Sequence, residues 1–313
     1  MASADKHDAL THRETSKIIT ECVIFSLMFL TALIGNVLVC LAFYKNPTLR
    51  RSLNNYFIIS LAVSDILMAL LVETLTLGAF VTERWPFSDT LCQYHGVCMF
   101  ILGVVSLQTL MLISVNRYFK MVKSGILYKK IFRKKTVLWM VAAAWILASV
   151  PLPIFLLSGN RFYFNSDRTI CYPDSSLRGS RIFLHCIYTI FIAIPSCIIV
   201  FCYYKVFKTI RAHNAQIANS VVSENSDIAL RSFKRESRLT KMLFVTLVGF
   251  ELCWIPLYLL EMMDLFHEDL DAPRAVYVMT TFTVSASSSI NPMIYAVMNK
   301  DFRNTFKNLL LCR

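Results

Sequence analysis

Seven long apolar stretches separated by polar connectors dominate the pattern of this chain. Five of them hold no charged residue, and they cover residues 22–44, 90–116, 136–160, 182–204 and 275–299. Two more hold isolated acids: residues 56–80 contain Asp65 and Glu73, and residues 242–260 contain Glu251. A helix needs roughly 20 apolar residues to cross the hydrocarbon core of a bilayer, and a soluble core does not repeat such runs along a whole chain. The pattern therefore predicts an all-α membrane protein, a seven-transmembrane helix bundle.

The two ends of the chain differ from this central part. Residues 1–17 are polar and lack the apolar core of a signal peptide, so we expect an uncleaved tail. Residues 18–299 form the membrane domain. Residues 300–313 place Phe302, Phe306, Leu309 and Leu310 at helical spacing beside basic residues. Such spacing is typical of a short amphipathic helix that lies on the membrane surface.

Basic residues are concentrated in alternate connectors. The connectors after the first, third and fifth apolar runs, together with the C-terminal tail, hold 23 of the 32 lysines and arginines. The positive-inside rule places these segments in the cytoplasm and the N-terminal tail outside the cell. We therefore expect a multi-pass membrane protein in this orientation. The net charge of +12 follows from this topology and from attraction to anionic membrane lipids, so it does not indicate a nucleic-acid partner.

Three of the ten cysteines lie at informative places. Cys92 opens the third apolar run on the outer side, and Cys171 lies in the outer connector between the fourth and fifth runs. Because both face an oxidising compartment, we expect a disulfide that pins this connector across the mouth of the bundle. Cys312 follows the amphipathic segment on the inner side, which makes it a candidate for palmitoylation.

Short motifs recur at matching depths in successive apolar runs. They are GNVLV around Asn36, SLAVSD ending at Asp65, SVNRY around Arg117, Trp145 with Pro151 and Pro153, Pro195 with Tyr203, FELCWIP from Phe250 to Pro256, NPMIY from Asn291 to Tyr295, and DFRNTF from Asp301 to Phe306. In this order they resemble the rhodopsin-like (class A) G-protein-coupled receptors over residues 18–312. The resemblance implies a receptor, not an enzyme, that converts binding of an extracellular ligand into activation of a heterotrimeric G protein.

The resemblance also implies a conformational switch at the inner end of the bundle. Arg117 would pair with Glu236 at rest and contact the G protein when the receptor is active. The family usually carries an aspartate before this arginine, and Asn116 stands there instead, so we expect raised basal activity. The other residues that match the switch are Tyr118, Tyr203, Phe250, Pro256, Asn291, Pro292 and Tyr295.

The same region resembles one subgroup of the family. The sequence Asn-Arg-Tyr around Arg117 also occurs in the melatonin receptors, and residues 97–131 and 238–306 resemble that group. Its members usually lack a proline where this chain has Pro292.

Two acids are predicted near the middle of the bilayer, where a charge is costly unless it faces the bundle interior. Asp65 resembles the acid of the class A sodium-binding pocket, whose other members would be Ser106, Ser287, Ser288 and Asn291. The family usually has Asn where Ser287 stands. The alternative is a protonated acid within a hydrogen-bond network. Glu251 lies on the same helical face as Trp254, at the depth of Asp65, so we expect the two acids to share one proton or one sodium ion.

The positions that match a ligand pocket are mostly apolar or aromatic, with hydroxyl groups. They are Met99, Phe100, Gly103, Val104, Tyr188, Phe191, Trp254, Leu257, Tyr258, Tyr277, Thr281 and Ser285. No acid or base is expected in the deep part, which predicts a small, largely apolar ligand. Glu73 and Glu261 are expected at the outer mouth, where they contact a ligand or pair with an arginine such as Arg168. An amphipathic amine or a short peptide that contacts these acids is the alternative ligand.

Several other chemistries are disfavoured by residues that the sequence lacks. A retinal Schiff base needs a lysine in the seventh apolar run, and none lies between Lys241 and Lys300, so we expect no covalent retinal. Aminergic receptors carry an aspartate where this chain has Met99, which disfavours a monoamine bound in the usual way. The sequence also lacks the internal repeats of many transporters and the paired metal ligands of an intramembrane enzyme.

The predicted orientation can be tested with epitope tags at the two ends of the chain. A tag at residue 2 is expected to be labelled on intact cells and a tag at residue 313 only after permeabilisation, because 23 basic residues mark the cytoplasmic side. Immunofluorescence with and without detergent measures this. Labelling of only the C-terminal tag on intact cells would contradict the orientation.

Overall fold

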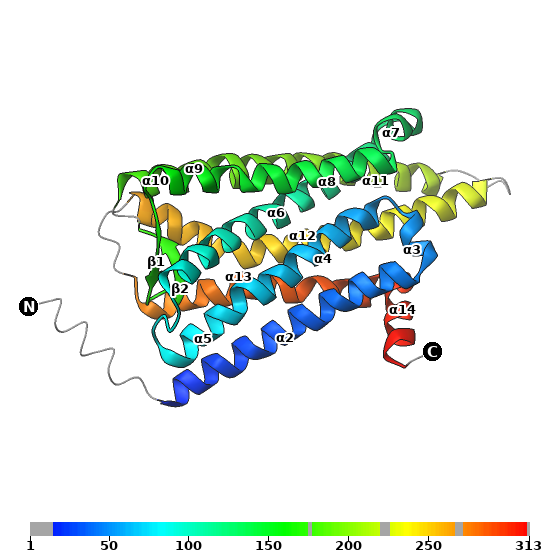
Figure 1. Ribbon diagram of the computed structural model, residues 1–313. Coiled ribbons are helices and arrows are strands. Elements are labelled where there is room, and N and C mark those ends of the chain that lie inside the picture. Colours follow the sequence, from blue (N-terminus) through cyan, green and yellow to red (C-terminus); the bar gives the residue numbers. More distant parts are fainter. Residues whose placement is uncertain (1–14, 175–176, 220–225, 267–271, 312–313) are drawn as a thin grey trace, which may run out of the picture.

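The computed structural model describes residues 15–174, 177–219, 226–266 and 272–311. Long helices run side by side as a bundle, with a β-hairpin at one end and a short crosswise helix at the other (Figure 1). The bundle consists of α2 (Thr15–Lys45), α4 (Asn54–Met68) continued by η1 (Ala69–Glu73) and α5 (Thr74–Thr82), α6 (Asp89–Met121), α8 (Lys134–Ser149) with α9 (Pro151–Leu157), α10 (Arg178–Cys186) continued by η2 (Ile187–Ala193) and α11 (Ile194–Asn219), α12 (Ser226–Phe266) and α13 (Arg274–Met298). The shorter elements are α3 (Pro47–Arg51), α7 (Gly125–Ile131), α14 (Lys300–Leu310) and the antiparallel strands β1 (Phe162–Asn165) and β2 (Ile170–Pro173).

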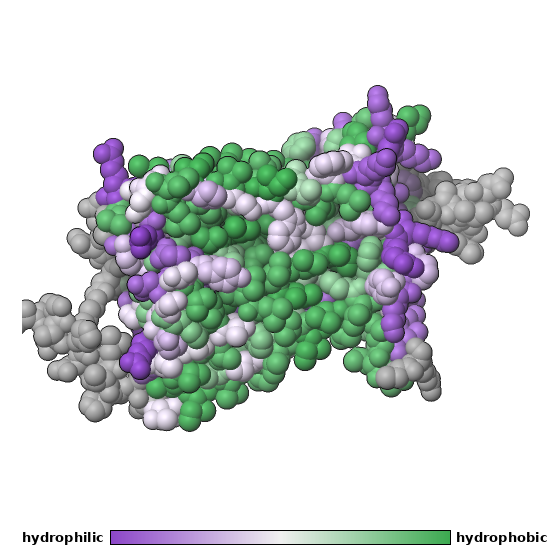
Figure 2. Space-filling model, viewed as in Figure 1, coloured by the Kyte–Doolittle hydropathy of each residue, from purple (hydrophilic) through white to green (hydrophobic). Residues whose placement is uncertain are grey.

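The helices of the bundle differ in how apolar they are. Among the described residues, six helical segments are long and apolar enough to cross a membrane. The seventh, α13, has 25 residues and carries buried hydroxyl side chains that lower its hydropathy, at Thr280, Ser285, Ser287, Ser288 and Ser289. It packs between α2 and α12 in the same bundle, so the predicted seven-helix fold is confirmed. Figure 2 shows hydrophobic residues around the middle of the bundle and hydrophilic residues gathered at its ends.

Most helices extend beyond the apolar runs of the sequence. The first helix, α2, begins at Thr15, so the last residues of the predicted tail, 15–17, are helical. In the basic connector before the sixth apolar run, α11 continues to Asn219 and α12 starts at Ser226. These added turns lie beyond the length that the hydrocarbon core requires, so they can be polar. Hydrophobicity therefore located the membrane-crossing part of each helix and missed its ends.

Two of the helices contain a π-helical turn. In η2, Pro195 has no backbone N–H for the carbonyl one turn earlier, and the N–H of Ile194 bonds to the carbonyl of Thr189. In η1, the N–H of Thr74 bonds to the carbonyl of Ala69, to which the Thr74 hydroxyl also donates at 3.0 Å. Each π turn adds one residue to a helical turn. The side chains that follow it are therefore rotated about the helix axis relative to their positions in a uniform α-helix.

The hairpin of β1 and β2 covers the outer end of α6. A disulfide joins Cys92 at the start of α6 to Cys171 in β2, with 5.5 Å between their Cα atoms, so the predicted pair is confirmed. Gln93 holds the other strand, because its side chain donates to the Phe162 carbonyl at 2.7 Å and accepts from the Phe162 N–H at 2.9 Å. Gly96 permits this close approach, since a Cβ there would lie 2.8 Å from a ring carbon of Phe162.

At the opposite end, α14 lies across the bundle (Figure 1). The Asn299 side chain caps this helix by accepting a hydrogen bond from the Asp301 N–H at 2.9 Å. Phe302 and Phe306 are buried and Leu310 is exposed. The predicted amphipathic helix is therefore confirmed, whereas Cys312, the palmitoylation candidate, lies outside the described residues.

The disulfide is expected to hold the hairpin on the bundle. Cys171→Ser should lower the free energy of unfolding by about 2–5 kcal/mol, because the covalent tether to α6 is lost. Thermal unfolding of the purified protein in detergent measures this. Cys98→Ser is the matched control, since Cys98 is an unpaired cysteine of the same helix. Equal effects of the two substitutions would contradict the proposed role of the bond.

Candidate functional site

A cavity lies in the outer half of the bundle, beneath the hairpin. Its empty space, counted together with its opening to solvent, amounts to about 870 Å³. The positions predicted from sequence that line it are Glu73, Met99, Phe100, Gly103, Val104, Tyr188, Trp254, Leu257, Tyr258, Thr281 and Ser285. Sequence reasoning missed the lining residues Phe25, Met68, Val72, Thr76, Leu107, Ile170, Tyr172, Ile187, Ile192, Thr280 and Val284.

Trp254 of α12 forms the deep end of the cavity wall. Its ring lies against Gly103 of α6, where a Cβ would come within 2.7 Å of the indole. The indole Nε1 donates to the Ser287 hydroxyl of α13 at 3.2 Å. Phe250 stacks on the indole one turn below, with 5.5 Å between ring centroids. Trp254 therefore connects the cavity to three helices at once.

Phe191 is not part of the cavity wall. Its neighbours Ile187 and Ile192 line the cavity, while Phe191 packs into the aromatic cluster beside it. All three residues belong to η2, whose π turn changes the direction of the side chains. The resemblance to class A receptors predicted Phe191 for this part of the wall, where the structure has Ile187 and Ile192.

A buried cluster joins the hairpin to α12 and α13 beside the cavity. Arg168 of the hairpin turn pairs with Glu261 of α12, with 2.5 Å between Nη1 and Oε1. The guanidinium carbon lies 4.6 Å from the ring centre of Tyr172 and 4.8 Å from that of Tyr277. Thr281 of α13 donates its hydroxyl to the Arg168 carbonyl at 2.8 Å. These five residues are called the roof cluster below.

The roof cluster accounts for two positions that were predicted to contact a ligand. Glu261 and Tyr277 lie outside the cavity wall and bind Arg168 instead. Of the two alternatives for Glu261, a ligand contact or an arginine pair, the structure has the arginine pair. Burial, with a smaller contribution from the charge of Glu261, raises the pKa of Tyr172 well above its ordinary value. Tyr172 therefore stays protonated, with its hydroxyl 2.7 Å from that of Tyr188.

Glu73 lies in the cavity wall and not at the solvent-facing mouth. Only 3% of its surface is exposed, and its Oε1 accepts a hydrogen bond from the Ser285 hydroxyl at 2.6 Å. Glu73 is the last residue of η1, so the π turn sets the direction of its side chain. Glu73 is therefore a buried acid of the cavity wall, whereas the sequence predicted a solvated acid near the outer mouth.

Asp65 lies deeper in the bundle and is buried. Its Oδ1 accepts from the Ser288 hydroxyl at 2.9 Å, and its Oδ2 accepts from the Asn291 amide at 2.9 Å. The other two predicted neighbours make different hydrogen bonds. The Ser106 hydroxyl is 3.0 Å from that of Ser64, and the Ser287 hydroxyl accepts from Trp254.

Glu251 does not join this group. The Ser196 hydroxyl of α11 donates to its Oε1 at 3.3 Å. Asp65 is held by α13 and Glu251 by α11, so the two acids occupy separate hydrogen-bonded sites. The structure therefore gives no support to a proton or sodium ion shared by the two acids, since residues at equal depth on two helices face different neighbours.

Arg117 is buried at the inner end of the bundle. Its Nη1 donates to the Glu236 carboxylate of α12 at 2.8 Å, and Lys120 lies 4.0 Å from the same carboxylate. Asn116 is buried too, and no hydrogen-bond partner reaches its amide group within the described part of the chain. The pairing of Arg117 with Glu236 that the sequence predicted is therefore present, and Asn116 adds no charge to it.

The remaining predicted switch residues surround this pair or lie along the inner halves of the helices. Tyr203 and Tyr295 are buried, and Tyr118 packs on Phe201 of α11 with 5.9 Å between ring centroids. Pro256 and Pro292 lie inside α12 and α13, where each removes one backbone hydrogen bond.

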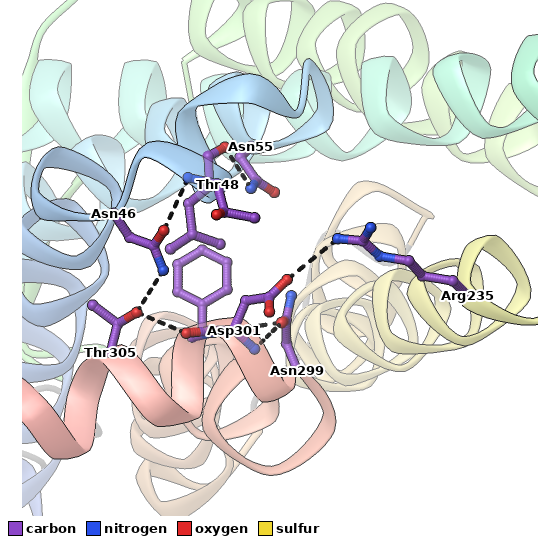
Figure 3. Close-up of polar contacts among 9 residues, drawn as sticks. Asn46, Thr48, Asn55, Arg235, Asn299, Asp301 and Thr305 are labelled. Carbon is purple, nitrogen blue, oxygen red and sulfur yellow. Dashed lines mark hydrogen bonds and ion pairs between the residues drawn. The ribbon is translucent and has the colours of Figure 1, made fainter. Parts of the chain in front are cut away.

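A second polar network joins α14 to the helices around it (Figure 3). The Asn46 amide donates to the Thr305 hydroxyl at 2.9 Å and so ties the end of α2 to α14. Arg235 of α12 reaches Asp301 of α14 at 3.5 Å. Both of these side chains are exposed, so the ion pair contributes at most about 1 kcal/mol. Arg235 precedes Glu236 in α12, so the two neighbouring residues connect this helix to α14 and to α6.

Comparison with known proteins gives matches to seven-transmembrane receptors. The chain matches the family model "7 transmembrane receptor (rhodopsin family)" over residues 35–295. It is similar to the D(1A) dopamine receptor of Xenopus laevis, with 31% identity over 100% of this chain and 77% of that protein. It is also similar to the RYamide receptor of Drosophila melanogaster, with 28% identity over 98% of this chain and 67% of that protein.

The fold is similar to the crystal structure of squid rhodopsin. The TM-score is 0.85 with 21% sequence identity, covering 96% of this chain and 88% of that one. At this identity the likeness concerns the fold alone. The likeness to the melatonin receptors stays a prediction.

The roof cluster is expected to contribute to stability. Glu261→Gln should lower the free energy of unfolding by about 3 kcal/mol or more, because it removes the carboxylate charge that pairs with the buried Arg168 guanidinium. Replacing both partners, with Arg168→Met and Glu261→Leu together, should recover much of this loss, since no buried charge remains. Thermal unfolding in detergent compares the variants, and a double variant less stable than Glu261→Gln would contradict the argument.

Proposed function

The chain belongs to the rhodopsin family of seven-transmembrane receptors and is a G-protein-coupled receptor, and we propose that its ligand binds in the cavity between the hairpin and Trp254. The protein is a multi-pass membrane protein. We place it in the plasma membrane, with the N-terminus outside and the C-terminus in the cytoplasm. In this arrangement the ligand enters from the hairpin side, and the heterotrimeric G protein binds where Arg117 and Glu236 lie. Membrane lipids surround the apolar middle of the bundle.

The observation that carries this proposal is that one continuous helix, α12, lines the cavity and also binds Arg117. Trp254 lines the cavity and stacks on Phe250 in the same helix. Toward its inner end the same helix carries Glu236, whose carboxylate binds Arg117. A ligand that displaces Trp254 would therefore act on the helix that restrains Arg117. Pro256, two residues after Trp254, provides a weak point at which α12 can bend.

The cavity supports a small ligand with a largely apolar, flat body. Phe100, Tyr188, Trp254 and Tyr258 supply aromatic surface, and Met99 supplies an adaptable side chain. The relatives are named as receptors for dopamine and for RYamide. An amphipathic amine or a short peptide therefore stays the alternative to a neutral ligand.

The Asp65 group supports a bound sodium ion as a second element of the proposal. It combines a carboxylate with the hydroxyl of Ser288 and the amide oxygen of Asn291, which has no hydrogen-bond partner in the described residues. Hard cations prefer such oxygen ligands. Ser106 and Ser287 would have to give up their present hydrogen bonds to contribute further oxygens.

The switch can be tested without any ligand. The wild-type receptor is expected to show basal signalling, because Asn116 gives Arg117 no adjacent counter-charge. Asn116→Asp should lower this signalling by stabilising the paired state of Arg117 by about 1–3 kcal/mol. Arg117→Ala should abolish G-protein activation while the protein still reaches the membrane. G-protein activation sensors in intact cells, normalised to surface expression, measure all three.

Asn116→Leu is the matched control, because it removes the amide without adding a charge. It should leave basal signalling closer to the wild-type value than Asn116→Asp does. Absence of basal signalling in the wild type, or a rise on Asn116→Asp, would reject the proposed restraint on Arg117.

A further inference from the structure

We propose that Glu73 binds the ammonium group of a protonated amine ligand, so that this receptor holds the cation from its second membrane span. The inference rests on the proposed function, because it assigns a ligand chemistry to the same cavity. It replaces the neutral ligand that the sequence favours by a cationic one whose body is apolar.

The Glu73 carboxylate is only half satisfied by the protein. Ser285 donates to Oε1 at 2.6 Å. The other oxygen, Oε2, is buried and accepts no hydrogen bond from any residue that the structure describes. Leaving a buried acceptor without a donor is costly, more so when it is charged. Since Glu73 also lines the cavity, a ligand can supply the missing donor.

The charge distribution around the cavity favours a cation over an anion. As far as the structure describes the cavity wall, Glu73 is its only aspartate, glutamate, lysine or arginine. The nearby Arg168 already pairs with Glu261 in the roof cluster. A positive ligand group would therefore compensate Glu73, whereas a ligand carboxylate would meet a like charge in a poorly solvated site.

The position of Glu73 also indicates how the amine would lie. Its carboxylate is held between η1 and α13, on the Ser285 side of the cavity. Met99 of α6 and the aromatic rings of Trp254 and Tyr258 form other parts of the wall. An amine on Glu73 thus leaves a flat apolar body free to contact these three side chains. A compact arylalkylamine, with one ring system and a short chain to the ammonium group, has this chemistry.

The test compares amines with neutral counterparts of the same shape. The purified full-length receptor is heated with tryptamine or tyramine, and in parallel with the alcohols tryptophol or tyrosol, in which a hydroxyl replaces the ammonium group. At least one amine should stabilise the wild type at concentrations where its alcohol does not. Glu73→Gln should weaken that amine by about 10- to 100-fold, because a charged hydrogen bond is lost, and should leave the weak effect of the alcohol unchanged.

Two further variants distinguish a direct contact from a general effect of charge. Glu83→Gln makes the same substitution directly after α5 and should change amine binding by less than about twofold, because Glu83 does not line the cavity. Glu73→Gln combined with Met99→Asp returns a carboxylate to the cavity from α6. This double variant should regain a large part of the amine binding that Glu73→Gln loses.

The assignment fails if the alcohols stabilise the receptor as well as the amines do. It also fails if Glu73→Gln keeps full amine binding, or if neither amine stabilises the wild type. Basal signalling and its loss in Arg117→Ala need no ligand, so they report on the proposed function separately. A receptor that passes that test and fails the amine test is a class A receptor whose ligand does not use Glu73 in this way.

Discussion

Hydrocarbon offers no hydrogen bonds, and most of this structure is a response to that constraint. Backbone groups within a membrane must be paired internally, which is why the membrane-crossing segments are helices. The same constraint acts on the acids of the interior. Asp65, Glu73 and Glu251 each accept a hydrogen bond from a serine hydroxyl on a neighbouring helix. Charge or polarity inside the bundle is therefore tied to contacts between helices, and a movement of one helix changes the environment of an acid on another.

The helix α13 carries most of these contacts, which explains why it is the least apolar of the seven. Ser285 donates to Glu73, Ser287 accepts from Trp254, and Ser288 donates to Asp65. The three serines lie within about one helical turn of one another. One short segment thus contacts the cavity wall, the aromatic residue at its deep end and the buried acid below. A change in the cavity can reach the middle of the membrane through this segment without passing through any loop.

The outer end is held by a different kind of interaction. The disulfide fixes β2 to α6, while the roof cluster fixes the hairpin turn to α12 and α13. A buried ion pair is a poor source of net stability, but it specifies geometry because either partner alone is costly to bury. Through Glu261 the hairpin contacts the same helix that carries Trp254 and Glu236. The position of the hairpin and the position of α12 are therefore linked.

The sequence by itself determined the membrane class, the seven helices, the Cys92–Cys171 pair and the pairing of Arg117 with Glu236. The first three follow from hydrophobic length and from the side of the membrane, whereas the pairing of Arg117 was implied by the resemblance to class A receptors. Tertiary structure alone decided which side chains share a space. Glu73 lines the cavity and Phe191 does not, and both belong to π-helical turns that the sequence pattern did not predict. Likewise, Glu261 pairs with Arg168 and Glu251 accepts a hydrogen bond from Ser196. Helix packing sets such partners across the bundle, and residue spacing along one helix does not predict them.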